Sequence, residues 1–370
     1  MIKKAIQNVY KVLKYFNSEN KYARKIYRIK KYLRIEKSVI NKEYRQKHLL
    51  YWKQLKKNVN PTWFDVYYFV TNKPDIYFVP ENIYYNIIES KSNNREISFA
   101  YKDKNFYDLF YAKENLFPEC IIRNIEGFFY DQNYKALSPN DELFSVILSK
   151  YQRVLVKPSI DSGGGRKIQL FNKVQNKFKN KNVDELSLNY LKQNFNCNYL
   201  IQNFIEQAPF FSQFNPSSMN TARIFTYRSV VTNEVISLKS VLRIGKKGSF
   251  VDNQAAGGIS CNINENHSLN NYAIDKFGNK YFEYNGIIFS DLPKVPMIED
   301  MKNIAVNLAE KNIYSRLIGF DFCLDIDGRV RLIEINNQFA EINFFQMNSS
   351  SLFGKYTDEI VRFCKKTKDY

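Results

Sequence analysis

The residues best placed to do chemistry lie in residues 319–336 (GFDFCLDIDGRVRLIEIN), towards the C-terminal end of the chain. Two runs that alternate apolar and polar residues flank Asp327-Gly328, which is a strong signal for a tight β-hairpin turn. A hairpin centred there pairs Asp321 with Glu334, and Asn336 leaves its strand on the same face as Glu334. Two carboxylates and an amide oxygen held this close need a cation, and an all-oxygen set suits Mg²⁺. The alternative is a two-stranded ribbon with a solvated acidic face.

A second candidate site lies where residues 153–157 (RVLVK), which read as a β-strand, meet the loop 158–167 (PSIDSGGGRK). Three successive glycines let the backbone approach a ligand closely and turn its N–H groups inward. Lys157 ends the strand and can offer a point charge to phosphate oxygens. The loop is neither a Walker loop nor a GxGxxG fingerprint, and a Gly-rich hairpin turn is its commoner explanation. Both a phosphate cradle and a plain turn therefore stay open.

The elements that must position these residues indicate an α+β protein of more than one lobe. At 370 residues the chain exceeds one small core, so two or three lobes are expected. The pattern predicts a basic helical arm over 1–57, a small α/β lobe over 58–150, and further lobes over 151–205 and 206–370. Within them we expect strands at 120–122, 127–130, 199–207, 224–231 and 235–244, helices after Ser138 and Pro293, and a polar loop at 251–258.

Composition narrows the classes of protein that fit. Hydrophobic residues at 44% and charged residues at 25% are typical of a soluble protein, and no apolar run reaches membrane-spanning length. The N-terminus lacks the features of a signal peptide. Five scattered cysteines without CxxC pairs fit a reducing compartment and no structural zinc. His48 and His267 are the only histidines, which leaves little room for His-based triads or metal sites. We expect a cytoplasmic protein.

The net charge of +18 is concentrated in residues 1–57, where 14 Lys and 4 Arg stand against three Glu, a balance of +15. Apolar residues recur there at steps of three and four: Ile2, Ile6, Val9, Leu13 and Phe16, then Tyr22, Ile26, Ile29 and Leu33. This spacing predicts two amphipathic helices separated by a break at residues 17–20. A lysine-rich face beside an apolar stripe can lie on an anionic membrane, such as the inner face of the cell membrane, or less readily contact nucleic acid. The alternative is a helical hairpin docked on the main body with its lysines solvated.

These pieces, in this order, resemble the ATP-grasp superfamily, and more narrowly the ATP-grasp group associated with sugar transfer and polysaccharide biosynthesis. The resemblance covers residues 100–345 and rests on Lys157 before SGGGRK, LIQNFIE, NTAR, the VDN…AGG loop and GFDF…DG…LIEIN. The spacing Asp321–Glu334–Asn336 is the most specific part of the resemblance. The resemblance implies an ATP-grasp fold, in which two α+β lobes clasp ATP.

The resemblance also implies roles for individual residues. Lys104 and Lys157 would lie on the phosphates of ATP, and a loop of Ser162, Gly163, Gly164 and Gly165 would cover them. Backbone groups of Gln202, Asn203, Phe204 and Ile205 would hold the adenine, with Glu206 as a ribose ligand. Asp321, Glu334 and Asn336 would bind Mg²⁺.

The chemistry that the resemblance implies is that of a carboxylate–amine ligase, which phosphorylates a carboxylate before an amine attacks the acyl phosphate. Lys157 and Arg223 are the expected catalytic cations. The Arg223 fork can bind acyl-phosphate oxygens bidentately, and a cross-strand ion pair is its alternative role. Asp252 and Asn253 are expected near the acceptor substrate, or else in a β-turn with Asx hydrogen bonding.

The expected substrate is a bacterial cell-surface glycan or its precursor, for example a uronic acid to be joined to an amino acid. Two alternatives stay open. One is an ATP-dependent kinase on the same fold, and the other is a non-catalytic nucleotide- or glycan-binding protein.

Overall fold

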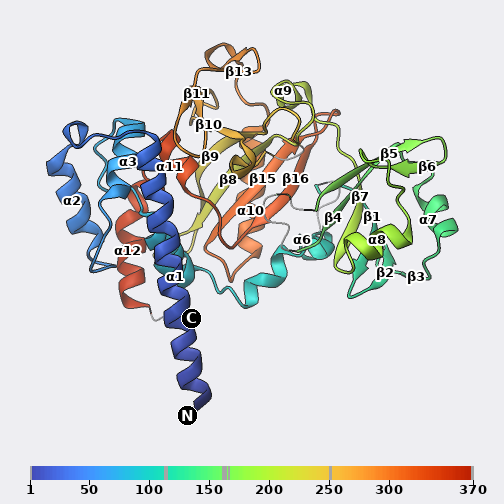
Figure 1. Cartoon of the computed structure of the whole chain (residues 1–370), viewed down its shortest axis with the longest axis horizontal. Helices are drawn as coiled ribbons and strands as arrows, with labels where there is room; N and C mark the ends of the chain where they lie inside the picture. Colours follow the sequence, from blue (N-terminus) through green and yellow to red (C-terminus); the bar gives the residue numbers. More distant parts are fainter. Residues whose placement is uncertain (1, 112–115, 161–164, 166, 250–251, 368–370) are drawn as a thin grey trace.

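Two seven-stranded sheets form the frame of the molecule, and helices cover them (Figure 1). The computed structural model describes residues 2–111, 116–160, 165, 167–249 and 252–367. The first sheet contains β1 (Cys120–Ile125), β2 (Phe128–Asp131), β3 (Ala136–Leu137), β4 (Arg153–Pro158), β5 (Gln169–Val174), β6 (Lys177–Lys179) and β7 (Tyr199–Asn203). The second contains β8 (Thr221–Arg228), β9 (Val235–Ile244), β10 (Ile259–Ile263), β11 (Leu269–Ile274), β12 (Lys280–Tyr281), β15 (Leu317–Leu324) and β16 (Val330–Asn336). A separate ribbon consists of β13 (Glu283–Tyr284) and β14 (Ile287–Ile288).

The first sheet has the order β3-β2-β1-β7-β4-β5-β6. Antiparallel pairing of β1 with β7 brings strands from both sides of residue 150 into one layer, so this layer spans the lobe boundary that the sequence suggested. Two helices accompany the sheet, α7 (Asp141–Leu148) and α8 (Leu188–Asn194), and share its apolar core. α7 begins two residues later than Ser138 suggested, because the Asn140 side chain accepts a hydrogen bond from the Leu143 N–H and caps the helix.

The second sheet has the order β12-β11-β10-β9-β8-β15-β16. Every residue of β8 and β15 is buried, which indicates that both faces of the sheet are covered. α10 (Ile298–Lys311) packs on one face, with Met301, Ala305 and Leu308 in the core. A helical layer covers the other face.

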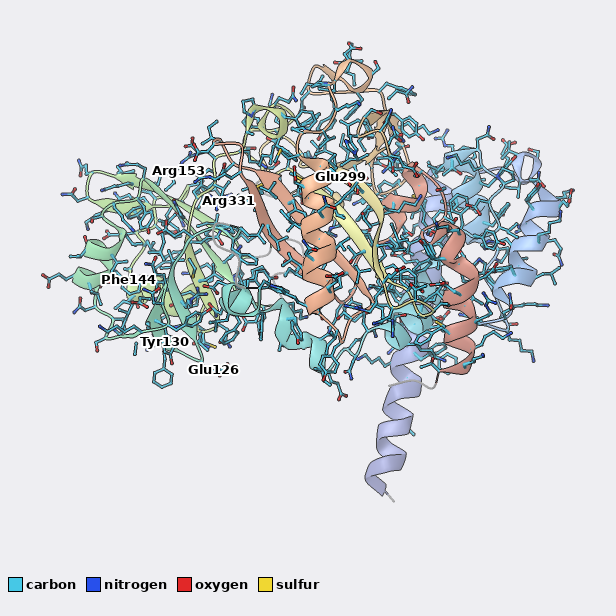
Figure 2. The ribbon with its side chains drawn as sticks, turned by 180° about the vertical axis from the view of Figure 1, so that it is seen from behind. Glu126, Tyr130, Phe144, Arg153, Glu299 and Arg331 are labelled. Carbon is cyan, nitrogen blue, oxygen red and sulfur yellow. The ribbon has the colours of Figure 1, made fainter. Side chains whose placement is uncertain are left out.

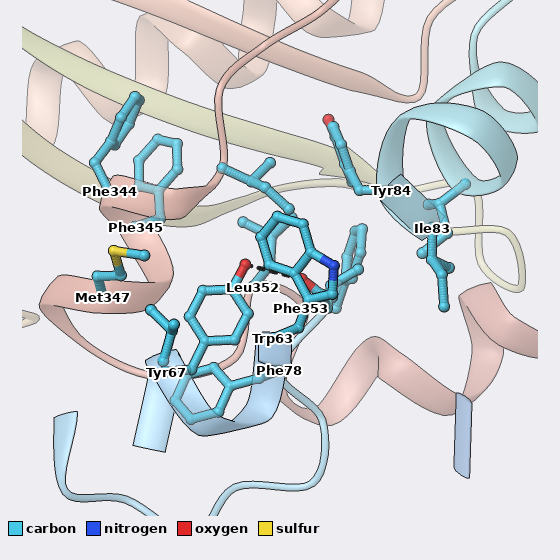
Figure 3. Packing of buried hydrophobic residues seen from close by; sticks show 14 of the residues in the cluster. Trp63, Tyr67, Phe78, Ile83, Tyr84, Phe344, Phe345, Met347, Leu352 and Phe353 are labelled. Atoms are coloured by element: carbon cyan, nitrogen blue, oxygen red, sulfur yellow. Dashed lines mark hydrogen bonds between the residues drawn. The ribbon is translucent and has the colours of Figure 1, made fainter. Parts of the chain in front are cut away.

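The helical layer joins segments from the two ends of the chain. Its helices are α1 (Ile2–Tyr32), α2 (Lys42–Trp52), α3 (Thr62–Thr71), α4 (Glu81–Ile83), α5 (Glu89–Ser92), α11 (Asn343–Asn348) and α12 (Thr357–Lys366). Figure 3 shows the aromatic rings of Trp63, Tyr67 and Phe78 gathered with Phe345 and Phe353. The remaining short helices are η1 (Lys37–Val39), η2 (Tyr84–Ile88), η3 (Ile97–Lys102), η4 (Lys104–Phe106), α6 (Tyr107–Tyr111), α9 (Pro209–Ser212), η5 (Gln254–Ala256), η6 (Phe289–Asp291) and η7 (Gly354–Tyr356).

The basic arm contains one long helix where the sequence predicted two. α1 continues through residues 17–20 because the polar side chains there bind the body instead of capping a helix end. Ser18 donates to Asn86 at 2.7 Å, and Glu19 accepts from Asn86 at 2.7 Å and pairs with Lys56. The part of the chain that the structure describes contains no helix both long and apolar enough to cross a membrane.

The hairpin β15–β16 has the predicted register at its chemically important end. Asp321 pairs directly with Glu334, as the sequence indicated. The turn itself differs, because Asp325 pairs with Arg329 around a loop in which Gly328 takes a positive φ of 77°. A bulge between Asp321 and Phe322 then restores the register. The loop and the bulge each shift the pairing by one residue, and the two shifts cancel.

Candidate active site

Two cavities meet between the first and second sheets. The first, of about 700 Å³, is lined by β1 and β7 on one side and by residues of the β15–β16 hairpin on the other. The second, of about 590 Å³, is lined by β4 and by the inward residues of β8, β9, β15 and β16. Lys104, Lys157 and Gln202 line both cavities, so the two lysines stand where the cavities join.

Lys157 is a buried cation at this junction. It lies on β4 and is 5% exposed, and its ammonium makes no hydrogen bond or ion pair with any residue that the structure describes. Burial, and then the neighbouring Lys104 ammonium, lower the pKa of Lys157 to about 7. The Lys104 side chain is 7% exposed, and its Nζ lies 3.0 Å from Glu334 Oε1. A buried lysine without an anionic partner is costly to hold, and an anionic ligand would remove that cost.

Four charged residues form a row across the second sheet. Arg223 pairs in register with Asp321, and Asp321 with Glu334, so the three side chains leave the same face. Arg243 on β9 pairs with Thr221, two residues before Arg223, and joins them on that face. The order across β9, β8, β15 and β16 is therefore two cations followed by two anions.

Asp321 is neutralised from two directions. The Arg223 guanidinium holds both of its oxygens, and Arg243 Nη1 donates to Oδ2 at 3.3 Å. Burial alone would raise the pKa of Asp321, but the two guanidiniums outweigh it and the pKa is lowered. At Glu334 burial is likewise outweighed, chiefly by the Lys104 ammonium, and the pKa is lowered. Both carboxylates are therefore ionised at neutral pH.

Arg243 also organises the polar loop after β9. Its Nη2 lies 3.1 Å from Asp252 Oδ1 and 3.1 Å from Asn253 Oδ1, which brings both predicted loop residues to the wall of the second cavity. The Asp252 carboxylate also accepts from the Thr221 hydroxyl. Burial raises the pKa of Asp252 to about 6, against the opposing effect of Arg243. The Asn253 backbone carbonyl accepts from the N–H groups of residues 256 and 258, so the loop is a hydrogen-bonded turn as well as part of the cavity wall.

The segment predicted to hold adenine lies at the end of β7 and just beyond. Gln202, Phe204, Ile205 and Glu206 line both cavities, and Asn203 lines the first. Glu206 pairs with Arg153, whose guanidinium also stacks over the Phe204 ring at 4.2 Å. Figure 2 labels Arg153, at the start of β4 in the first sheet, and Arg331, on β16 of the second sheet.

Three of the four residues predicted to cover the phosphates, Ser162, Gly163 and Gly164, lie outside the described residues. Gly165 is described, has a positive φ of 70° and lines the second cavity near Lys157.

The residues predicted to bind Mg²⁺ fit a hard divalent cation in type and position. Asn336 Nδ2 donates to Asp321 Oδ2 at 3.3 Å, which places the amide beside the carboxylate pair. No described residue donates to Glu334 Oε2 or to Asn336 Oδ1, so two oxygens on this face remain to accept a cation. Asp321 could contribute only by sharing its oxygens with Arg223. The described residues contain no cluster of three or more His, Cys, Asp or Glu, so any metal site here includes the amide.

Sequence reasoning missed two cations of this site, Arg243 and Arg153. Both lie on strands predicted from their apolar residues, and a charged residue inside a buried strand was the only signal. Recognising them requires knowing that β9 neighbours β8 and that β4 neighbours β7.

Two sheets that meet at shared cavities, with a buried lysine on one and a paired acidic hairpin on the other, are the arrangement expected of an ATP-grasp protein. The chain belongs to the sugar-transfer associated ATP-grasp family, whose sequence model matches residues 86–360. No curated protein has a significant sequence match to it.

Several solved structures are similar over much of the chain. The ATP-grasp ligase PsnB, in complex with a minimal precursor, aligns with 74% of this chain and 64% of its own at 12% identity and a TM-score of 0.41. The biotin carboxylase domain of 2-oxoglutarate carboxylase from Hydrogenobacter thermophilus aligns with 72% and 46%, at 15% identity and a TM-score of 0.41. N5-carboxyaminoimidazole ribonucleotide synthetase from Thermotoga maritima aligns with 70% and 48%, at 10% identity and a TM-score of 0.37. The chain thus spans less than two thirds of each of these proteins.

Proposed function

We propose that the protein is an ATP-dependent carboxylate–amine ligase that releases ADP. The observation that carries this proposal is Lys157, a buried ammonium without an anionic partner among the described residues, at the junction of two cavities. Phosphoryl transfer requires positioning and charge neutralisation more than covalent chemistry from the protein. The cations around this junction provide that neutralisation.

The residues divide the work between the two cavities. Gln202, Asn203, Phe204 and Ile205 hold adenine at the wall of the first cavity. Glu206 releases its ion-pair partner Arg153 and accepts a hydrogen bond from a ribose hydroxyl instead. Lys157 and Lys104 hold the phosphates at the junction. Glu334 and Asn336, with Asp321, hold Mg²⁺, which when bound neutralises phosphate charge.

The second cavity contains the groups that handle the acid and the amine. Arg223 and Arg243 bind the substrate carboxylate beside the phosphates and neutralise the acyl phosphate that forms. One carboxylate oxygen attacks the terminal phosphorus and ADP leaves; the amine then attacks the acyl carbon and phosphate leaves. Asp252, with its pKa raised to about 6 by burial, and Asn253 orient Arg243 next to the attacking amine.

The association of the family with sugar transfer supports a sugar as part of the substrate. We propose a bacterial cell-surface glycan, or its precursor, as the carboxylate substrate. A uronic acid joined to an amino acid is one such pair. We place the reaction in the cytoplasm, where ATP is available.

The test is an ADP-release assay with ATP and Mg²⁺ over a panel of uronic acids and amino acids, followed by mass spectrometry of the product. Release that requires both an acid and an amine, with an amide product, supports the ligase. Release with the acid alone, leaving a stable phosphorylated product, identifies a kinase instead. Lys157→Met should abolish turnover, and Lys192→Met, at an exposed position in α8, serves as the matched control.

A further inference from the structure

α1 consists of two halves with different surroundings. From residue 18 onwards the helix is fixed to the body by buried apolar residues, Tyr22, Ile26 and Ile29, which join the core of the helical layer. Two ion pairs strengthen this contact: Lys25 with Glu81 at 2.7 Å and Lys30 with Asp65 at 2.6 Å. The half before residue 18 extends away from the rest of the ribbon, and both Figure 1 and Figure 2 show it projecting alone.

The projecting half presents apolar side chains to solvent. Val9, Leu13 and Phe16 are 60%, 57% and 59% exposed. Their steps of four and three place them on one side of the helix. That side is not the one that docks, because Tyr22, Ile26 and Ile29 occupy a face turned well away from it. A cluster of large apolar side chains that is mostly exposed indicates an interaction surface.

The same side of the helix becomes basic towards the body. Beyond Phe16, steps of three and four lead to Asn20, Arg24, Tyr27 and Lys31. These four residues are exposed, with Tyr27 at 64%. Arg24 and Lys31 form no ion pair with any residue that the structure describes, and nor do the exposed Lys14 and Arg28 beside this line. One line along the helix therefore carries apolar, then aromatic and cationic side chains.

We propose that this side of α1 docks on an anionic membrane surface. Val9, Leu13 and Phe16 insert into the interface between headgroups and acyl chains, while Lys14, Arg24, Arg28 and Lys31 contact lipid phosphates. An amphipathic helix with an apolar stripe and a Lys/Arg-rich flank binds membranes in this way, and Tyr27 suits the headgroup level. Each basic residue near an anionic surface contributes about fivefold in affinity, so a few contacts with a short apolar stripe give reversible binding.

A second copy of this chain is the competing occupant of the stripe, and the charge argues against it. The apolar side chains described as exposed here, Val9, Leu13 and Phe16, span about one heptad, whereas stable coiled coils need at least three or four. Pairing two copies would also bring together two arms of +15 each. An anionic surface complements that charge.

The experiment is cosedimentation of the full chain with phosphatidylcholine vesicles, with and without phosphatidylglycerol, at low and high salt. We expect binding that requires phosphatidylglycerol and weakens with salt. Val9→Ser/Leu13→Ser/Phe16→Ser should lower it at least tenfold without lowering the Tm, since these side chains are mostly exposed and lie outside the core. Its matched control, Phe128→Ser/Val231→Ser/Ile313→Ser, removes side chains that are 69%, 71% and 64% exposed elsewhere and should bind like the wild type.

A charge variant completes the design. Lys14→Gln/Arg24→Gln/Arg28→Gln/Lys31→Gln should abolish the preference for phosphatidylglycerol, whereas Lys135→Gln/Lys181→Gln/Lys192→Gln/Lys247→Gln, at exposed positions elsewhere, should retain it. Wild-type protein that ignores phosphatidylglycerol, or a triple apolar variant that binds as tightly as wild type, overturns the proposal. A further combination of results also overturns the proposal. In it, the wild type fails to bind vesicles but forms a dimer in analytical ultracentrifugation, and the triple apolar variant does not form that dimer.

Discussion

Replacing Lys157 by Met should stabilise the protein and abolish nucleotide binding in the same variant. Lys157 is buried and its pKa falls from 10.5 to about 7, chiefly through burial. At 1.36 kcal/mol for each pKa unit, holding the charged form costs roughly 5 kcal/mol. Met has a similar length and no charge, so it recovers part of that cost. Because 1 kcal/mol shifts the Tm of domains of this order of size by about 2–4 °C, we expect a rise of several degrees.

The pH dependence of this effect has a definite sign. The unfolded chain keeps Lys157 protonated up to pH 10.5, whereas the folded protein loses that proton near pH 7. Between these values the unfolded state binds more protons, so the stability of the wild type rises with pH. The advantage of Lys157→Met is therefore full below about pH 7 and disappears towards pH 10.5.

Scanning calorimetry across this pH range, with titration calorimetry of ATP and Mg²⁺ at each pH, measures both effects. Lys104→Met is the matched control, because the Lys104 side chain is only 7% exposed but is paired with Glu334. Its loss leaves a carboxylate without its ammonium and should lower the Tm. A Lys157→Met variant with a lower Tm than wild type, or with unchanged affinity for ATP, would refute the reasoning.

Three further predictions follow from the row of charges and the loop beside it. Glu334→Gln should keep the fold by circular dichroism but reduce Mg²⁺-dependent ATP turnover by on the order of 10²–10³-fold, the cost of removing one charge contact from a dry site; turnover at the wild-type rate would contradict a metal site on the hairpin. Arg243→Met should lower the Tm more at pH 8 than at pH 5, because Asp252, whose pKa is already about 6 through burial, can take up a proton once its guanidinium is gone; an equal loss at both pH values would show that the pair matters little. Gly258→Ala should lower the Tm and disturb the loop, because a Cβ there would lie 2.7 Å from the carbonyl oxygens of residues 252 and 244, whereas Gly319→Ala, with nearest atoms at 3.6 Å, should cost little.

The features predicted correctly from the sequence are those formed by residues close to one another along the chain. Asp321 and Glu334 are joined by a short hairpin, so a turn signal and strand periodicity were enough to pair them. Even in this hairpin the predicted pairing next to the turn is wrong by one residue. The pairing of Asp321 with Glu334 is right because the bulge between Asp321 and Phe322 shifts the register back by one residue. The same local reasoning failed at α1, where residues 17–20 looked like a break because their partners Asn82 and Asn86 lie far along the chain.

Features that depend on the order of strands could not be predicted. Arg243 reaches Asp321 only because β9 lies beside β8 and β8 beside β15, an order that periodicity does not encode. The partnership of β1 with β7 likewise depends on the sheet as a whole. The family resemblance supplied the expected roles of Lys104, Lys157 and residues 202–206, and the structure shows that these residues meet at one junction.

The helical layer has a consequence for how the protein is made. Residues 62–92 bury their aromatic side chains against α11 and α12, with Tyr67 donating to Asn343 at 2.8 Å and Val79 N–H to Gln346 at 2.8 Å. On the ribosome, residues 62–92 emerge long before residues 343–366, which cover their apolar side chains. Until residues 343–366 have left the exit tunnel, the apolar face of α3 stays uncovered and exposed to chaperones. The layer therefore completes its core only after residues 343–366 emerge, and deleting α11 and α12 would leave residues 62–92 without part of that core.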